Sequence, residues 1–306
     1  MPVKLRNMPV NGETGRRNLI GLNRYLYILF TLSQYICIKH IMASKVIYQV
    51  DAFTSEPFSG NPAGVCITEK EEPSGWMQNI AAEMNLSETA FLFSEGGMLN
   101  IRFFTPEAEI DLCGHATLSS AHILFETGLA SPGQVIMLSS KAGILSARKD
   151  GEWISLDFPS YGVKRTEIPE KFLKASGINP PELYRTSNGW ALAVCKTEEE
   201  VKKMSPDFAG LCDSGFGDLI VTAPSGSSDF DYVLRCFAPA LGINEDPVTG
   251  SAQCVLVPYW NARSGKKEFK VRQLSARGGV LRCLLQGNRV IISGQAKTVF
   301  RAELFV

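Results

Sequence analysis

The sequence predicts an α+β fold of two pseudosymmetric halves, each a mostly antiparallel β-sheet wrapped around one central apolar helix. A pattern of a strand, a proline-containing loop and a glycine opening an apolar helix occurs twice, over 102–116 and again over 235–252. From residue 45 onwards, short strand-like runs alternate with only a few helices. No G-x-G-x-x-G loop follows a strand, so a dinucleotide-binding fold is disfavoured.

The first half is predicted to hold two helices. Trp76, Ile80 and Met84 recur at four-residue spacing, which predicts a helix over 73–85. The motif helix, 114–127, is almost entirely small and apolar, so we expect it to be buried nearly all round. Runs rich in β-branched and aromatic residues predict strands at 45–52, 63–68, 88–94, 100–104, 135–139, 143–148 and 153–158.

Charges and two prolines over 159–170 mark the boundary between the halves. The second half is predicted to contain a helix near 169–176 and the second motif helix over 250–262, which is again apolar. Its strands are predicted at 191–195, 218–223, 232–237, 268–274, 279–286, 289–293 and 297–305.

Residues 1–44 are predicted to be an N-terminal extension outside the fold. The apolar stretch 25–38 is shorter than the roughly 20 residues that a membrane-spanning helix needs. Lys39-His40-Ile41 offers no small residues for a signal cleavage site. Met42 runs straight into the first strand, so we interpret 1–41 as an upstream extension, as from a misassigned start; a membrane anchor is the alternative.

The composition is that of a globular protein, with 45% hydrophobic residues and a formal net charge of +0. No basic stripe or run of like charge predicts a nucleic-acid or membrane partner. None of the 8 cysteines forms a C-x-x-C pair, and no dense cluster of His and Cys has metal-ligand spacing, so no metal site is predicted. Scattered thiols are typical of a reducing compartment, which predicts a cytoplasmic location.

Glu88 is a single carboxylate at the start of an apolar strand. One interpretation is a charge at a strand edge that points to solvent, because charged side chains are rarely buried without a partner. The other is a carboxylate in a dry pocket. Burial would raise its pKa towards neutrality there, so that it could both take up and return a proton.

The two motif helices begin alike, with His115 after Gly114 in the first and Ser251 after Gly250 in the second. A lone His is often a structural hydrogen-bonding residue. However, a helix N-terminus has unpaired N–H groups and a partial positive charge, which together bind anions such as carboxylates. Two such helix starts facing each other would form a cleft with donors on both sides.

Two further residues near these helix starts allow more than one interpretation. Asp246, just before Pro247, is either a turn or capping residue, a group that orients a substrate amine or hydroxyl, or a partner for His115 across the cleft. Cys113 is either an ordinary buried thiol or one whose pKa is lowered at a helix N-terminus.

Four motifs, in order, resemble those of the phenazine biosynthesis-type isomerases, the PhzF-like family. The resemblance covers roughly residues 45–306 and has no counterpart for the segment before Met42. The motifs are Val50-Asp51-Ala52-Phe53-Thr54 with Phe58-Ser59-Gly60-Asn61-Pro62-Ala63-Gly64-Val65, Ser87-Glu88-Thr89-Ala90-Phe91, Cys113-Gly114-His115-Ala116-Thr117 and Glu245-Asp246-Pro247-Val248-Thr249-Gly250-Ser251-Ala252.

The resemblance implies the fold of diaminopimelate epimerase, with the site between the halves. The first half is then 45–160 and the second 161–295, and the strand 296–306 returns to the first half. It also implies a homodimer and a cofactor-independent isomerase acting on a small metabolite that bears a carboxylate.

The resemblance assigns roles to individual residues. Glu88 is implied to be the proton shuttle, which removes a proton from an activated carbon and redelivers it elsewhere. Residues implied to assist catalysis or to bind the substrate are His115, Asp246, Ser87, Gly114, Gly250 and Ser251.

Two alternatives remain open. Related racemases use two cysteines as paired acid and base; Cys113 occupies the first position, but the second is Thr249, whose hydroxyl titrates far too high to act as a base. Racemisation or epimerisation of an amino acid would then have to use Glu88 with Cys113. The other alternative is a binding or regulatory module without turnover.

Overall fold

The computed structural model describes residues 45–306, which form one compact unit. The predicted extension at 1–44 lies outside the described residues. None of the helices between residues 45 and 306 is long and apolar enough to cross a membrane.

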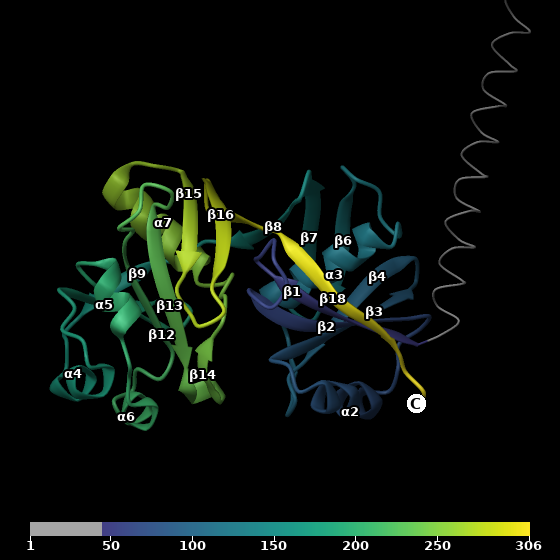
Figure 1. Cartoon of the computed structure of the whole chain (residues 1–306), viewed down its shortest axis with the longest axis horizontal. Coiled ribbons are helices and arrows are strands. Elements are labelled where there is room, and N and C mark those ends of the chain that lie inside the picture. The colour runs from purple at the N-terminus through teal and green to yellow at the C-terminus, as the bar shows by residue number, and fades with distance from the viewer. Residues whose placement is uncertain (1–44) are drawn as a thin grey trace, which may run out of the picture. The chain divides into compact units, whose positions relative to one another are not determined.

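The first half is a sheet wrapped around helix α3 (Gly114–Glu126), most of whose residues are buried. Helix α2 (Ser74–Met84) contacts β3 and β4. Strand β18 (Ala296–Glu303) runs antiparallel to β1 at the C-terminal end of the chain (Figure 1). The other strands are β1 (Val46–Ala52), β2 (Asn61–Thr68), β3 (Glu88–Glu95), β4 (Met98–Phe104), β5 (Glu109–Ile110), β6 (Val135–Ser140), β7 (Gly143–Asp150) and β8 (Trp153–Pro159).

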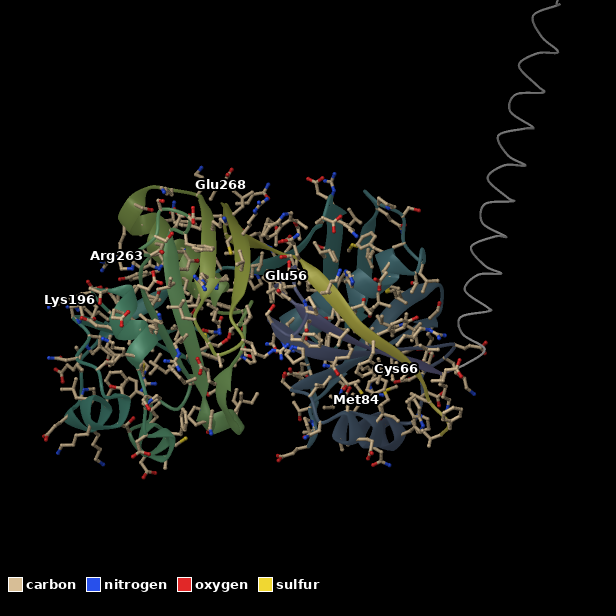
Figure 2. The ribbon with its side chains drawn as sticks, viewed as in Figure 1. Glu56, Cys66, Met84, Lys196, Arg263 and Glu268 are labelled. Atoms are coloured by element: carbon tan, nitrogen blue, oxygen red, sulfur yellow. The ribbon has the colours of Figure 1, made fainter. Side chains whose placement is uncertain are left out.

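The second half packs its sheet against helix α7 (Gln253–Ser264). Its strands are β9 (Val163–Thr166), β10 (Glu182–Thr186), β11 (Ala191–Val194), β12 (Leu219–Pro224), β13 (Tyr232–Ala238), β14 (Ile243–Asp246), β15 (Glu268–Gln273), β16 (Gly279–Gln286) and β17 (Arg289–Gly294). Its shorter helices are α4 (Glu170–Ser176), α5 (Glu198–Lys203), α6 (Phe208–Asp213) and the single turn η1 (Pro239–Leu241). Figure 2 shows Lys196, Arg263 and Glu268 on the outside of this half, where they are exposed to solvent.

Strand pairing repeats between the halves. The parallel pair β2–β3 corresponds to β11–β12, and the antiparallel pair β3–β4 corresponds to β12–β13. The parallel pair β4–β6 likewise corresponds to β13–β15. Antiparallel pairing of β8 with β17 joins the two halves into one continuous sheet. The predicted α+β architecture with two similar halves is therefore confirmed.

The duplicated motif contains the same ion pair in both copies. Arg102 Nε lies 2.7 Å from Glu109 Oε1, and Arg235 Nε lies 2.7 Å from Glu245 Oε1. Each guanidinium also lies over the Phe ring two residues further along its strand, at 5.2 Å for Arg102 and 4.9 Å for Arg235. In each copy of the repeat, the Arg–Glu ion pair therefore connects the strand to the loop that follows it.

The second motif helix starts later than predicted. We expected it to begin at Gly250, but α7 begins at Gln253. The N–H groups of Gln253, Cys254 and Val255 donate to carbonyls three residues back, as in a tight turn, and only Leu256 makes the helical bond, to Ala252. The residues from Gly250 to Ala252 therefore form a turn that leads into the helix.

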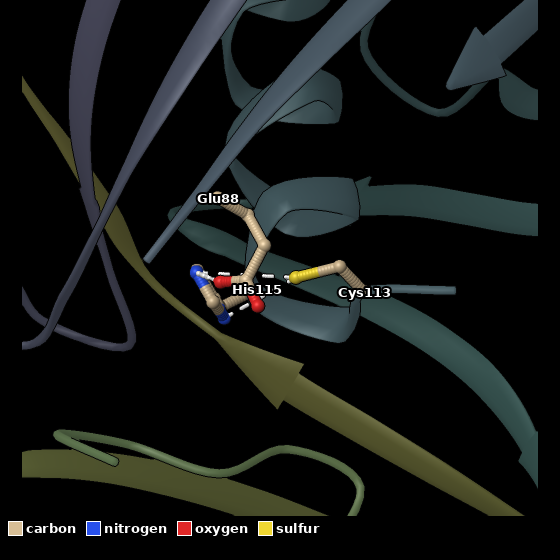
Figure 3. A group of neighbouring side chains, drawn as sticks. All are labelled: Glu88, Cys113 and His115. Atoms are coloured by element: carbon tan, nitrogen blue, oxygen red, sulfur yellow. Dashed lines mark hydrogen bonds and ion pairs between the residues drawn. The ribbon is translucent and has the colours of Figure 1, made fainter. Parts of the chain in front are cut away.

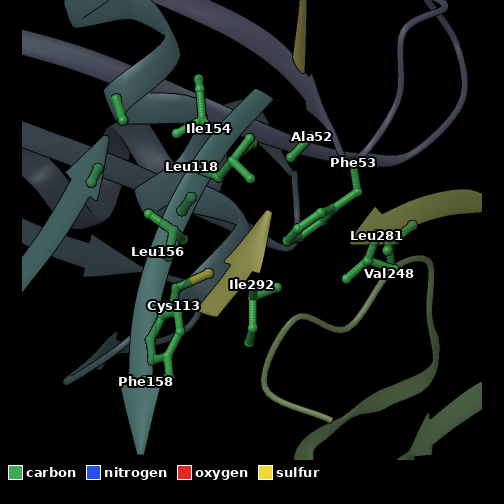
Figure 4. Packing of buried hydrophobic residues seen from close by; sticks show 14 of the residues in the cluster. Ala52, Phe53, Cys113, Leu118, Ile154, Leu156, Phe158, Val248, Leu281 and Ile292 are labelled. Atoms are coloured by element: carbon green, nitrogen blue, oxygen red, sulfur yellow. The ribbon is translucent and has the colours of Figure 1, made fainter. Parts of the chain in front are cut away.

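Phe53 packs into the junction between the halves (Figure 4). It is fully buried and has a φ of 63°, a conformation that costs a bulky residue free energy and persists only when the surroundings enforce it. Its ring faces Gly250 and Gly294, where a Cβ atom would collide with it. Its carbonyl accepts a hydrogen bond from Val280 N at 2.9 Å, which ties the start of β16 to the end of β1.

We predict that Gly294→Ala lowers the free energy of unfolding by about 1–3 kcal/mol, because the added methyl group overpacks against Phe53 and Leu118. Urea unfolding followed by circular dichroism measures this. The matched control is Gly162→Ala at an exposed glycine with no atoms near its Cβ position, where we expect a change within roughly 0.5 kcal/mol. Equal stability of the two variants would contradict the packing that we describe at Phe53.

Candidate active site

The β-sheet and the central helix of the first half bring together Glu88 and His115. Glu88 is the first residue of β3 and lies opposite Ala63 of β2, while His115 is the second residue of α3. Glu88 Oε2 lies 3.0 Å from His115 Nε2, and only about a tenth of either side chain is exposed (8% for His115 and 10% for Glu88) (Figure 3). The interpretation of Glu88 as a solvent-facing strand-edge charge is therefore wrong.

Cys113 completes this group. It is the residue before α3, and its buried Sγ lies 3.4 Å from His115 Nδ1 and 3.9 Å from His115 Nε2. One ligand-type atom from each of Glu88, Cys113 and His115 lies within 4.8 Å of the others. The sequence predicted no such cluster, because Glu88 is distant along the chain and joins the pair at α3 only through the fold.

Asn61 bridges the two halves beside this group. Its Nδ2 donates to Asp246 Oδ1 at 2.8 Å and to the Val248 carbonyl at 2.9 Å, both in the second half. The same nitrogen lies 3.3 Å from His115 Nδ1. Asp246 therefore does not pair directly with His115, because the Asn61 amide lies between them.

Thr249 and Gln273 hold Asp246 in place from the other side. The Thr249 hydroxyl donates to Asp246 Oδ2 at 2.5 Å. Gln273 accepts from Thr249 N at 2.8 Å and donates to the Asp246 carbonyl at 2.8 Å. Since Gln273 is fully buried, these bonds fix the loop on which Asp246 stands.

The four remaining predicted site residues lie around this centre with different exposures. Ser87 precedes Glu88 and donates to Asn61 Oδ1 at 3.4 Å. Gly114 has open space at its Cβ position apart from one Phe158 atom at 3.9 Å. Gly250 is buried against Phe53, so its lack of a side chain serves the packing of the junction. Ser251 is exposed, in the turn before α7.

The Glu88 carboxyl and the His115 imidazole stabilise each other's charged forms. Burial raises the pKa of Glu88, but the His115 charge, with hydrogen bonds from His115, Ser87 and Cys113, outweighs burial, so the pKa lies below its ordinary value. Burial lowers the pKa of His115, yet Cys113 and Glu88 raise it well above the ordinary value. The expected upward shift for Glu88 is therefore wrong, because that expectation left out the imidazole.

Cys113 and Asp246 are shifted towards their neutral forms. Burial raises the pKa of the Cys113 thiol, and the Glu88 carboxylate raises it further. Of the two interpretations of Cys113, the ordinary buried thiol is therefore confirmed and the thiol with a lowered pKa is wrong, because burial outweighs the effects that lower the pKa. Burial also raises the pKa of Asp246. The His115 charge and the hydrogen bond from the Thr249 hydroxyl lower this pKa and so offset part of the rise.

Sequence reasoning missed Asn61 and Gln273 as parts of the site. Asn61 is part of the first of the four motifs that resemble the family, but the sequence predicts no role for it. Gln273 ends the strand β15, where nothing in the local pattern marks it. Both are fully buried amides, and only their position across the junction reveals their role.

A surface pocket of about 420 Å³ lies outside this group. It is lined by residues of both halves, including Ser59, Arg277 and Gln295, and by none of the catalytic candidates. Arg277 there pairs with the buried Asp51 at 2.8 Å and donates to the Gly60 carbonyl. These contacts help to hold the halves together next to the Asn61 loop.

Comparison with known proteins gives one consistent family. Residues 50–302 match the family of phenazine biosynthesis-like proteins, PhzC-PhzF. The chain is 47% identical over 266 residues to an uncharacterized isomerase of Halalkalibacterium halodurans, which covers 87% of this chain and 100% of that protein.

Solved structures agree with the family match. A phenazine biosynthesis protein of the PhzF family from Enterococcus faecalis superimposes with a TM-score of 0.82 at 44% identity, covering 86% of this chain and 100% of that one. A probable proline racemase from Agrobacterium radiobacter, 13% identical, superimposes with a TM-score of 0.59 over 86% of this chain and 93% of that one. The second likeness concerns the fold alone.

We predict that Asn61→Ala lowers the free energy of unfolding by about 1–3 kcal/mol, because it removes a buried donor from the Asp246 carboxylate and the Val248 carbonyl. Urea unfolding measures this loss. Asn100→Ala, which removes only a solvent-exposed hydrogen bond to Met98, is the control and should change stability by less than about 0.5 kcal/mol. If the two variants were equally stable, Asn61 would not be the bridge that the geometry indicates.

Proposed function

The chain belongs to the phenazine biosynthesis-like (PhzC-PhzF) family and is an isomerase, and from this we propose that it moves a proton between carbons of a small carboxylate-bearing metabolite. The predicted family and its fold are confirmed by the relatives and solved structures. Glu88 is the proposed proton shuttle, and no cofactor takes part in the proposed reaction. The observation that carries this proposal is the buried Glu88–His115 pair.

Glu88 combines the features that a proton shuttle needs. His115 keeps the carboxyl ionised, so it is available as a base at neutral pH. Glu88 Oε2 is buried and lies 3.0 Å from His115 Nε2. A buried carboxylate oxygen beside an imidazolium is suited to accept a proton from a substrate carbon.

The proposed cycle regenerates the Glu88 carboxylate. Glu88 removes a proton from a carbon that the substrate's own functional groups acidify, and a double bond shifts in the substrate. The neutral Glu88 carboxyl, whose proton exchanges with solvent during the cycle, then donates a proton to another carbon of the same molecule. During this time the His115 charge no longer faces a carboxylate and instead stabilises the negative charge that develops on the substrate.

The residues around Glu88 are proposed to bind and orient the substrate. First-turn N–H groups of α3, at Gly114 and His115, have no partner within the helix and attract a carboxylate. Asp246, fixed by Asn61 and Thr249, orients a polar group of the substrate from the second half. Ser87, Gly250 and Ser251 are proposed to complete the binding site.

Racemisation by Glu88 with Cys113 is less well supported. Two groups that act on opposite faces of one carbon each approach it to about 3 Å, which separates them by roughly 6 Å. The carboxylate oxygen of Glu88 and the Sγ atom of Cys113 lie within 4.8 Å of each other, which is closer than this separation. The raised pKa of Cys113 further disfavours it as a base. The homodimer and the cytoplasmic location remain predictions.

The decisive test uses Glu88→Gln. Wild-type protein and the variant are incubated with metabolite extracts in D₂O, and deuterium incorporation is followed by mass spectrometry. We expect a metabolite that gains deuterium with the wild type and loses about 10²–10⁴-fold in rate with Glu88→Gln. Glu95→Gln, at the exposed end of the same strand, is the matched control and should behave as wild type.

Equal labelling by wild type and Glu88→Gln would remove Glu88 from this role. Labelling with inversion of a stereocentre would instead indicate a racemase. If no metabolite in any of the extracts gained deuterium with the wild type, the result would support a binding module.

Cys113→Ser tests whether the thiol takes part in the chemistry. Serine preserves a small polar side chain at the start of α3, so we expect the rate of the isomerisation to stay within roughly 10-fold of wild type. The measurement is the same deuterium assay. A loss as large as that of Glu88→Gln would contradict the proposal and favour a mechanism that needs the thiol.

A further inference from the structure

We propose that Glu88, Cys113 and His115 form a binding site for a divalent transition-metal ion of the zinc type, and that such an ion blocks the isomerase. This goes beyond the proposed function, because the ion would be an inhibitor and not a participant in the reaction. The binding itself rests only on the geometry of these three side chains and can be tested without a substrate.

The donor atoms of the three side chains lie close enough together to meet at one tetrahedral zinc ion after a rotation of the imidazole ring. Tetrahedral Zn²⁺ with ordinary bond lengths places its nitrogen and oxygen ligands about 3.3 Å apart and its sulfur and nitrogen ligands about 3.6 Å apart. Here His115 Nε2 lies 3.0 Å from Glu88 Oε2 and 3.9 Å from Cys113 Sγ. Cys113 Sγ lies nearer to His115 Nδ1, at 3.4 Å, and all the donor atoms lie within 4.8 Å of one another. The imidazole ring must therefore turn for one of its nitrogens to point at an ion shared with Glu88 and Cys113.

The ligand atoms are held ready on rigid elements. Cys113 and His115 flank the first residue of α3, and Glu88 begins β3, so the backbone fixes all three. Glu88 Oε2 is buried beside His115 Nε2, at 3.0 Å, so a bound cation would take the place of the imidazolium charge that it now faces. All three residues are buried, as in protein sites that exclude competing water ligands.

The charges of the site favour a dication. Glu88 pairs with His115, and no lysine or arginine of the described part of the chain forms an ion pair with it. Asp246 adds a second carboxylate nearby, on the other side of Asn61. An ion that binds displaces the Cys113 thiol proton and the imidazolium proton to solvent, so the thiolate, the Glu88 carboxylate and a neutral imidazole together neutralise M²⁺.

The ligand types select the metal. A thiolate with an imidazole favours Zn²⁺ and Co²⁺ over Mg²⁺ and Ca²⁺, which prefer sites made of oxygen atoms. Three protein ligands leave the fourth position for water or a substrate carboxylate. An ion bound there occupies Glu88 Oε2 and cancels its basicity, which explains why binding would stop proton transfer.

Co²⁺ titration of the metal-free full-length protein tests the site directly. Thiolate coordination to Co²⁺ produces a near-ultraviolet charge-transfer band, which we expect to saturate at one equivalent. The band should disappear with Cys113→Ser and persist with Cys212→Ser, the matched control at an exposed cysteine. Mg²⁺ at the same concentration should neither compete with Co²⁺ nor raise the melting temperature, whereas Zn²⁺ should do both.

Glu88→Gln serves as an independent variant, since it keeps the thiol and the imidazole. We expect Zn²⁺ affinity, measured by competition against Co²⁺, to fall on the order of 10-fold or more. Absence of the band in the wild type, or its persistence in Cys113→Ser, would overturn the proposal. So would unchanged Zn²⁺ affinity in Glu88→Gln. Because none of these readouts uses turnover, failure of the metal site and failure of the proposed isomerisation are distinguishable.

Discussion

The packing of Phe53 between the two halves is the constraint on which the site depends. Its strained backbone and buried ring are enclosed by glycines from the second half, where any side chain would collide with it. This junction brings the Asn61 loop of the first half against the loop of Asp246, so that the Asn61 amide can donate to two groups of the second half. Without a fixed junction, Glu88 and Asp246 would have no defined separation, and neither alone could both deprotonate and orient a substrate.

The features that the two halves share are structural, whereas the proposed site residues differ between the halves. Both copies preserve an arginine that ties its strand to the following loop through a glutamate, Glu109 in one half and Glu245 in the other. The proposed base, Glu88, stands outside the repeat, on the strand next to the first copy. The second copy supplies Asp246, whose carboxyl group is held by hydrogen bonds and is shifted towards its neutral form. Each half thus contributes a carboxyl group with a different protonation preference, a common basis for separate acid–base and binding roles.

One electrostatic arrangement accounts for both the catalytic and the inhibitory proposals. A buried carboxylate, imidazole and thiol can share protons, and the same three groups can bind a metal ion that replaces those protons. With protons present, His115 keeps Glu88 ionised and Cys113 stays a neutral thiol. With a dication present, the thiol becomes a ligand and the base is lost.

The sequence alone determined the family, the α+β class, the two similar halves and the residue types of the centre, because these follow from local patterns and short motifs. It also located Glu88, His115, Cys113 and Asp246 as candidates. Only the tertiary structure decided their pairing. The downward pKa shift of Glu88, the buried and neutral Cys113, and the Asn61 amide between His115 and Asp246 depend on contacts across the fold. A residue's charge state is set by the groups a few ångströms away in space, and for these residues most of those groups are distant along the chain.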